Sequence, residues 1–316
     1  MNTATKIGAY VLGLAALFGG AAGIGNAVGP VGATEKQGEG ETHGGHGGSK
    51  TATTAKSAID TPGGLMVTRD GYTLRPKAAT IVPGEPTDFQ FTVNGPDGRP
   101  VTDYQPLHGK KLHLIVARRD LSGFQHVHPT MDGSGVWSIP LTLKDPGVYR
   151  FLTDIKPAGE KEQLTLGVDI TAPGDYQPTK LPLPTQVAVV DGYAVSLTGK
   201  LTPGRSSKVT LTVSKDGEPI TDLEPYLEAY GHLVALRDGD LAYLHVHPEG
   251  EPGDGKTKPG PGVTFFAEVP SAGTYRLYLD FQHKGKVRTA EFTVAAGGAD
   301  PVPPTDEGGD GHGHDH

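Results

Sequence analysis

The sequence predicts an all-β protein with two tandem immunoglobulin-like β-sandwich domains. Three observations lead to this prediction. Glycine and proline, 47 and 27 of the 316 residues, are spread through the chain, which favours short strands and turns over long helices. A long segment recurs at a constant offset, which indicates an internal duplication. Within each copy, short runs alternate polar and apolar residues between turn signals, as strands of a sandwich do.

The first 33 residues are predicted to be a signal peptide or a membrane anchor. Lys6 is the only charge before an apolar stretch that starts at Ile7, and Val31-Gly32-Ala33 is a candidate cleavage site. Uncleaved, the 25 uncharged residues from Ile7 to Val31 are long enough to cross a bilayer as a hydrophobic helix. Both alternatives place the rest of the chain outside the cytoplasm. The protein is then either secreted or anchored to the cell membrane, with this segment as its membrane contact.

Two low-complexity segments flank the predicted domains. Residues 34–63 form a Gly/His-rich linker, and residues 297–316 form a His-rich tail. Such compositions cannot bury enough apolar area to offset the entropy of ordering the chain. We therefore expect a disordered, flexible tether before the domains and a disordered tail after them.

The duplication defines the domains. Val101–Pro129 aligns with Ile220–Pro248 without a gap at an offset of 119, and ten of the 29 positions are identical. Downstream, Tyr149 matches Tyr275 at an offset of 126, so the second copy contains a seven-residue insertion. The predicted domains are residues 64–173 and 184–296, with seven or eight strands in each.

Matched segments predict the strands and their neighbours. We expect alternating strands at 88–93, 208–213, 149–155 and 275–281, and apolar central strands at 112–117 and 232–236. Asp97-Gly98 and Asp216-Gly217 are hairpin turn signals. Tyr149 and Tyr275 are expected to pack at strand corners, as in many immunoglobulin-like domains. Trp137 is expected in the core, and Arg118 and Arg237 are expected to pair with Asp120 and Asp240.

Composition excludes several kinds of partner and site. The net charge of −8 argues against binding to nucleic acid. Cysteine is absent, which excludes disulfides and thiolate metal sites. Only Met66 and Met131 follow the initiator, so a methionine-rich Cu(I) relay is excluded as well. A transition metal would have to use imidazole, carboxylate, methionine sulfur or backbone ligands.

Histidine spacing points to such a metal. Six of the 13 histidines form two sets with the pattern H-x12-H-x-H, namely His113, His126 and His128, and His232, His245 and His247. The last two members of each set lie two residues apart, so on a strand both face the same side and can reach one ion. Three imidazoles suit Cu(II) or Zn(II). Whether the first histidine joins them depends on the register between strands.

Two questions about these histidines stay open in the sequence. The fourth ligand could be water, or one of Asp103, Asp222, His108 and Met131. Buried histidines in β-proteins also often bond only a neighbouring carbonyl or carboxylate, and a duplicated domain inherits structural residues as readily as ligands. We weigh the metal hypothesis ahead of this one because each set contains the His-x-His pair.

The segments around the two His-Val-His-Pro motifs resemble a known group. Leu112–Pro129 and Gly231–Pro248 look like duplicated actinobacterial envelope proteins that are described as candidate metal-binding proteins. The expected fold is similar to the CopC-like and YtkA-like copper-handling domains, whose sandwich is immunoglobulin-like or cupredoxin-like. The resemblance implies copper or another divalent metal at both histidine sets. A histidine at the mature N-terminus, typical of CopC-like proteins, is replaced here by Thr34.

The expected function is therefore binding of a divalent metal outside the cytoplasm, Cu(II) first and Zn(II) second, for sequestration or delivery. A metal-handling protein of the envelope is an expected partner. The alternative is a non-metal structural or interaction module of tandem immunoglobulin-like domains on the cell surface. An enzyme is not expected, because no general base, nucleophile or oxyanion site stands out, and G-x-S-x-G, P-loop and HExxH motifs are absent.

Overall fold

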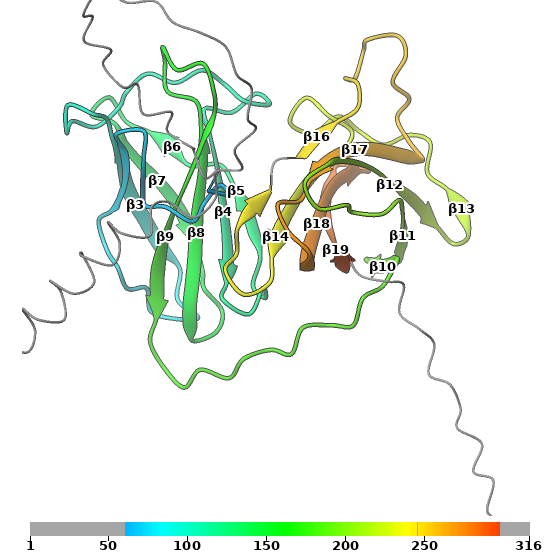
Figure 1. Cartoon of the computed structure of the whole chain (residues 1–316), viewed down its shortest axis with the longest axis horizontal. Coiled ribbons are helices and arrows are strands. Elements are labelled where there is room, and N and C mark those ends of the chain that lie inside the picture. The colour runs from blue at the N-terminus through cyan, green and yellow to red at the C-terminus, as the bar shows by residue number, and fades with distance from the viewer. Residues whose placement is uncertain (1–60, 245, 298–316) are drawn as a thin grey trace, which may run out of the picture. The chain divides into compact units, whose positions relative to one another are not determined.

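A computed structural model describes residues 61–244 and 246–297, without the side chain of His247. The predicted N-terminal segment, nearly all of the predicted linker and the tail beyond residue 297 lie outside the described residues. No helix long and apolar enough to cross a membrane occurs among the residues that are described. Within the described ranges every regular element is a β-strand (Figure 1).

The first domain is a sandwich of two antiparallel sheets. One sheet has the order β1-β2-β3-β7-β6, formed by Thr68–Arg69, Tyr72–Pro76, Thr87–Asn94, Val136–Leu141 and Thr130–Met131. The other has the order β5-β4-β8-β9, formed by Gln125–Val127, Leu112–Arg118, Gly147–Ile155 and Leu164–Ala172. The fold class predicted from the sequence is confirmed. Two-residue strands raise the number of strands above the seven or eight expected.

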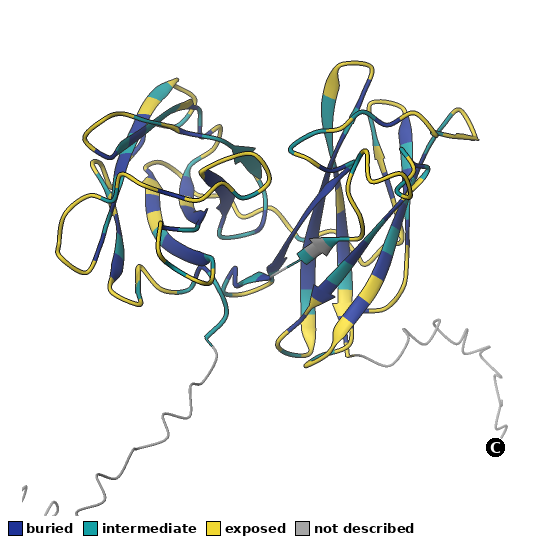
Figure 2. Cartoon of the chain, turned by 90° about the horizontal axis from the view of Figure 1, so that it is seen from above, coloured by how far each residue is buried: buried dark blue, intermediate teal, exposed yellow. Residues whose placement is uncertain are grey.

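The second domain repeats this arrangement. Its first sheet has the order β10-β11-β12-β17-β16, formed by Val187–Val190, Tyr193–Thr198, Ser206–Lys215, Gly262–Glu268 and Val246–Pro248; β13 (Glu218–Pro219) pairs with β12. Its second sheet has the order β15-β14-β18-β19, formed by Tyr243–Leu244, His232–Arg237, Gly273–His283 and Lys286–Ala296. Buried stretches run along the strands, and exposed ones gather in the connecting loops (Figure 2).

Residues predicted to be structural are found in those roles. The Tyr149 hydroxyl donates to the carbonyl of Asp145 at 2.9 Å, and the Tyr275 hydroxyl donates to the carbonyl of Ser271 at 2.8 Å. Trp137 is buried in the first core. The guanidinium of Arg118 pairs with Asp120, and that of Arg237 pairs with Asp240. The Asp216-Gly217 turn joins β12 to β13, with positive φ angles of 52° and 84° as a two-residue hairpin of type I′ requires.

The two apolar strands β4 and β14 are buried on both faces, which explains why neither alternates in sequence. Leu112, Leu114 and Val116 point into the core of the first domain. Ile115 and Ala117, on the opposite face of β4, belong to a separate apolar cluster that also contains Val234, Leu236, Leu241 and Tyr278 of the second domain. Because side chains alternate along a strand, His113 lies on the same face as Ile115. The faces that carry His113 and His232 are therefore the faces through which the two domains meet.

Candidate metal centre

Strand register brings the first histidine set together. In the antiparallel pair β4–β5, Leu114 lies opposite Val127 and Ile115 lies opposite His126. Continuing this register by one pair places His128 opposite His113. Since His113 and Ile115 share a face of β4, all three histidines project from the same side of the sheet. The sequence alone did not determine this register. The observed register is the one that a three-histidine site requires.

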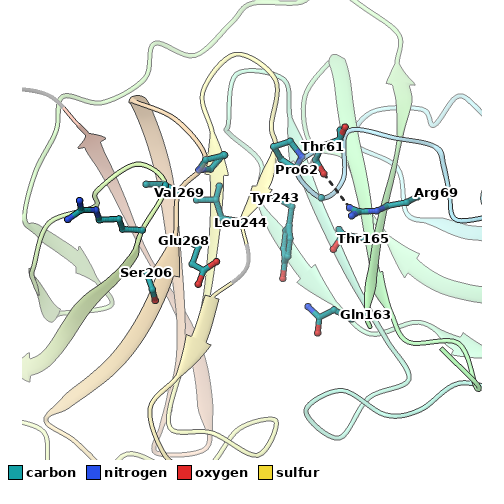
Figure 3. A pocket seen from close by; sticks show the side chains of 14 residues that line it. Thr61, Pro62, Arg69, Gln163, Thr165, Ser206, Tyr243, Leu244, Glu268 and Val269 are labelled. Atoms are coloured by element: carbon teal, nitrogen blue, oxygen red, sulfur yellow. Dashed lines mark hydrogen bonds between the residues drawn. The ribbon is translucent and has the colours of Figure 1, made fainter. Parts of the chain in front are cut away.

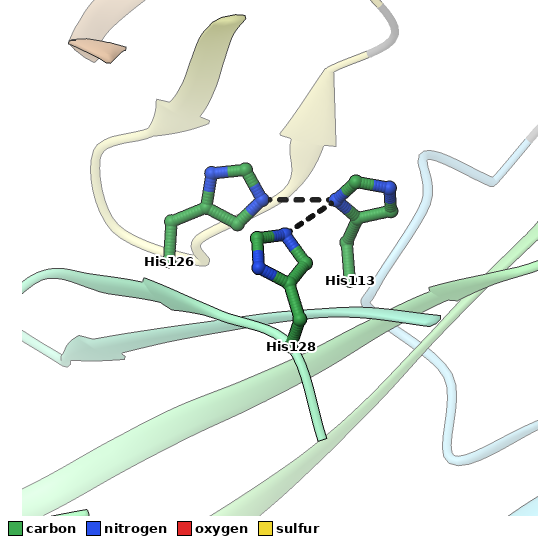
Figure 4. Close-up of side chains that lie close together, drawn as sticks. All are labelled: His113, His126 and His128. Atoms are coloured by element: carbon green, nitrogen blue, oxygen red, sulfur yellow. Dashed lines mark hydrogen bonds between the residues drawn. The ribbon is translucent and has the colours of Figure 1, made fainter. Parts of the chain in front are cut away.

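The three imidazoles converge on one point (Figure 4). Nδ1 of His113 lies 3.0 Å from Nε2 of His126 and 3.1 Å from Nε2 of His128. Among the described residues, this is the group of three or more His, Asp or Glu whose ligand atoms all lie within 4.8 Å of one another. Metal–nitrogen bonds of about 2.0–2.1 Å in a tetrahedral site place the nitrogens roughly 3.3 Å apart. The nitrogens would need to move by only a few tenths of an ångström to hold an ion.

Contacts on the far side of two rings determine which nitrogen carries the proton. Nε2 of His113 donates to the carbonyl of Leu107 at 2.8 Å, and because a carbonyl only accepts, Nδ1 of neutral His113 bears a lone pair. Nδ1 of His126 donates to a carboxylate oxygen of Asp280 at 2.7 Å, which leaves the lone pair on Nε2. Two lone pairs therefore face each other across 3.0 Å. This repulsive arrangement is relieved by a cation, either a metal ion or a proton.

Burial keeps the imidazoles of His113 and His128 neutral. Loss of solvation is the largest cause that lowers the pKa of both His113 and His128 to about 3, and the neighbouring histidines lower it further. Metal binding requires the unprotonated ring. At neutral pH both rings are therefore in the unprotonated form that can bind a metal ion.

The second set is only partly within the described residues. Nε2 of His232 donates to the carbonyl of Tyr226 at 2.8 Å, and burial lowers the pKa of His232 to about 4. His245 lies outside the described residues. The backbone of His247 lies in β16, opposite Phe266 of β17, and its side chain is not described. The ladder between β14 and β15 ends at Leu244, so the strand changes sheet earlier than in the first domain.

A small cavity of about 50 Å³ lies beside the first set, between the histidine-bearing faces. His108, His113, His126, His232 and Asp154 are among the residues that line it. The ring of His108 lies 6.3 Å from that of His113 and 5.3 Å from that of His232, measured between ring centroids.

Of the four residues considered as a fourth ligand, only His108 is among the described residues that line this cavity. Met131 packs against the apolar core of the first domain. Asp222 accepts a hydrogen bond from His283 at 3.1 Å, and Asp103 is exposed. Met131 and Asp222 therefore make their contacts elsewhere in the structure.

A larger pocket of about 550 Å³ is lined by Thr61, Arg69, Thr165, Tyr243 and Glu268, among others (Figure 3). The guanidinium of Arg69 donates to the carbonyl of Thr61 at 3.3 Å within it. It contains none of the three converging histidines.

The sequence interpretation missed two carboxylates. Asp154 and Asp280 are buried in β8 and β18, and each lies directly across the sheet from a first histidine, His113 or His232. They match at the same offset of 126 that relates Tyr149 to Tyr275. A carboxylate recurring in an otherwise apolar strand was the signal that could have revealed them.

Comparison with solved structures finds proteins that align with this chain at low identity. An Escherichia coli adhesin, FdeC, aligns at 15% identity over 73% of this chain and 65% of that chain, with a TM-score of 0.23. The Yersinia pseudotuberculosis adhesin InvE aligns at 12% identity over 71% of this chain and 58% of that chain, with a TM-score of 0.23. InvD from the same organism aligns at 14% identity over 75% of this chain and 61% of that chain, with a TM-score of 0.24. The chain spans less than two thirds of the length of each. With TM-scores below 0.5, these alignments support no conclusion about this chain.

A search of curated proteins returns no match. A family model described as "Domain of unknown function (DUF8832)" matches twice, over residues 67–172 and again over residues 188–298. The two matches coincide with the two sandwiches and with the two copies found in the sequence. The chain thus belongs to this family, and it carries two copies of the domain that defines it.

Proposed function

We propose that this chain binds a divalent metal ion, Cu(II) ahead of Zn(II), for sequestration or delivery outside the cytoplasm. The observation that carries the proposal is the pair of lone pairs on His113 and His126, which face each other at 3.0 Å with His128 beside them. The rings of His113 and His126 are oriented from behind by acceptors, Leu107 O and Asp280 respectively. Metal-ligating histidines are commonly held in this way by a carbonyl or carboxylate.

The donor set supports the choice of metal. Imidazole ligands suit Cu(II) and Zn(II), and at a given nitrogen site Cu(II) binds more tightly. The expected likeness of the fold to CopC-like and YtkA-like copper-handling domains agrees with this order. We extend the proposal to the second set, His232, His245 and His247, because it repeats the spacing and because His232 makes the same backbone contact as His113.

The proposed location follows from the N-terminal segment, read as a signal peptide or an anchor. A metal-handling protein of the envelope is the partner that would deliver or receive the ion. Both statements rest on the sequence, since residues 1–60 lie outside the described structure.

Metal titration of the full chain tests the proposal. We expect the wild-type chain to bind up to two equivalents of Cu(II), and the triple variant His113→Ala, His126→Ala, His128→Ala to lose one of them. His283→Ala is the matched control, because His283 is equally buried but bonds Tyr193 and Asp222 instead. Uptake that survives the triple variant at full stoichiometry would contradict the site.

The second candidate function is a non-metal interaction module of tandem immunoglobulin-like domains on the cell surface. The observation that favours it is the hydrogen bond of His126 to Asp280, which links the two domains without any metal. Several solved structures of similar fold are of bacterial adhesins. This candidate predicts no metal uptake, and histidine variants that change only stability.

A further inference from the structure

The carboxylate that orients His126 comes from the other domain. Asp280 lies in β18 of the second domain, opposite His232, and its side chain is only 4% exposed. One of its oxygens accepts from the hydroxyl of Thr289 at 2.6 Å. The second oxygen is thereby left to accept from Nδ1 of His126 in the first domain, at 2.7 Å.

The neighbouring contact between the domains holds this bond in place. Two residues before His126, the ring of Phe124 stacks on Tyr278 at 3.8 Å between centroids with an interplanar angle of 6°. Tyr278 in turn lies two residues before Asp280, and its hydroxyl donates to the carbonyl of Leu121 at 2.6 Å. The aromatic contact and the His126–Asp280 bond thus lie side by side on the same two strand faces.

The first domain's own carboxylate does not replace Asp280. Asp154 occupies the equivalent position and accepts from the hydroxyl of Thr165 at 3.0 Å, as Asp280 does from Thr289. Its other oxygen faces the hydroxyl of Tyr243, from the second domain, at 3.5 Å. Asp154 therefore has the same surroundings within its sheet, but among the described residues it makes no hydrogen bond to a histidine of the first set.

We propose that Asp280 is a positioning residue that completes the metal centre of the first domain across the domain boundary, so that metal binding and domain docking are coupled. The inference rests on the proposed function. The bond fixes the Nδ1–H form of His126 and turns its Nε2 lone pair toward His113 and His128. Removing such a partner typically weakens metal binding about 10- to 100-fold. Because coupling between sites is reciprocal, an ion bound at the first set also strengthens the contact between the domains.

The test compares Asp280→Ala, Asp280→Asn and Asp169→Ala in the full chain. All three are made together with His245→Ala and His247→Ala, which removes the second candidate set. Affinity for Cu(II) and for Zn(II) is measured by competition titration. The protonated nitrogen of His126 is identified separately, in the metal-free protein, by ¹⁵N NMR at neutral pH.

We expect Asp280→Ala to lower the affinity about 10- to 100-fold and to abolish the Nδ1–H signature of His126. Asp280→Asn has the same shape and keeps the fold if the alanine variant unfolds, and it should give a smaller loss in the same direction. Asp169→Ala removes a first-domain carboxylate that pairs with Arg119 and Arg150 and is not part of the histidine site, so it should leave both readouts near wild type. Unchanged affinity in both Asp280 variants would overturn the inference. If the wild-type chain takes up no metal, the proposed function is wrong. A persistent Nδ1–H signal of His126 would then identify its bond to Asp280 as purely structural.

Discussion

His113 and His232 are held by the same contact in the two domains: Nε2 of each donates to a backbone carbonyl six residues upstream, at 2.8 Å in both cases. The acceptors, Leu107 and Tyr226, each begin a tight turn with two successive positive φ angles, at residues 108–109 and 227–228. The first carbonyl of each turn accepts from the backbone N–H three residues on and, with its second lone pair, from the ring. The duplication has therefore preserved the orientation of the first histidine together with its identity.

This shared contact predicts that the second set binds metal as the first does. His232→Ala should remove one equivalent of Cu(II) from the chain, as His113→Ala does, because each variant deletes one of the three imidazoles of a set. Stoichiometry by titration of the two single variants and of the double variant is the measurement. If His232→Ala leaves uptake unchanged while His113→Ala lowers it, the second set is structural and the first stands alone.

Stability of the metal-free protein should rise with pH between about pH 4 and pH 6.5. Burial lowers the pKa of His113 and His128 to about 3 and of His232 to about 4, against 6.5 for the exposed side chain. In this window the unfolded chain binds more protons than the folded one, so acid favours unfolding. Stability from these groups is fully present above pH 6.5 and is lost as the pH falls.

One group opposes this trend. Burial raises the pKa of Asp154 to about 6, so its contribution is present at low pH and is lost as the pH rises through 6. Three histidines outweigh one carboxyl, and urea unfolding at several pH values should show the net rise. His113→Asn combined with His128→Asn should flatten the profile. An unaltered slope in that variant would contradict the assignment.

The tyrosine corners should stabilise each domain without affecting metal. Tyr149→Phe and Tyr275→Phe each remove one hydroxyl that donates to a backbone carbonyl four residues upstream. A hydrogen bond of this kind contributes about 1 kcal/mol net to the free energy of unfolding. Urea unfolding should show a loss of about this size in each variant, with Cu(II) stoichiometry unchanged. A change in metal uptake would show that the corners influence the site.

The contact between the domains should depend more on Tyr278 than on Tyr243. Tyr278→Phe removes a buried hydrogen bond of 2.6 Å to Leu121, whereas Tyr243→Phe removes a weak one of 3.5 Å to Asp154. We expect Tyr278→Phe to expose the connection between the domains, residues 173–186, to faster limited proteolysis, and Tyr243→Phe to have a smaller effect. Equal rates in the two variants would rule out this ranking.

Local pattern was sufficient for much of the fold. Strand periodicity located β3, β12, β8 and β18, and short-range chemistry predicted the hairpin at Asp216-Gly217 and the pair of Arg118 with Asp120. These features depend on residues near one another in sequence. The partners of His108, Asp222 and Met131 could not be predicted in this way, because each is selected by packing against distant strands.

The sequence by itself determined that the chain repeats one β-domain and that each repeat carries the same three-histidine spacing, because duplication and strand alternation are properties of residue order. Only the tertiary structure decided that His113 faces His126 and His128, since the register of β4 against β5 depends on how the whole sheet pairs. It also decided that the carboxylate behind His126 is Asp280, 154 residues away. That contact exists because the outer face of each central strand is too apolar to remain in water, and burying those faces together brings the histidines of one domain against the carboxylate of the other.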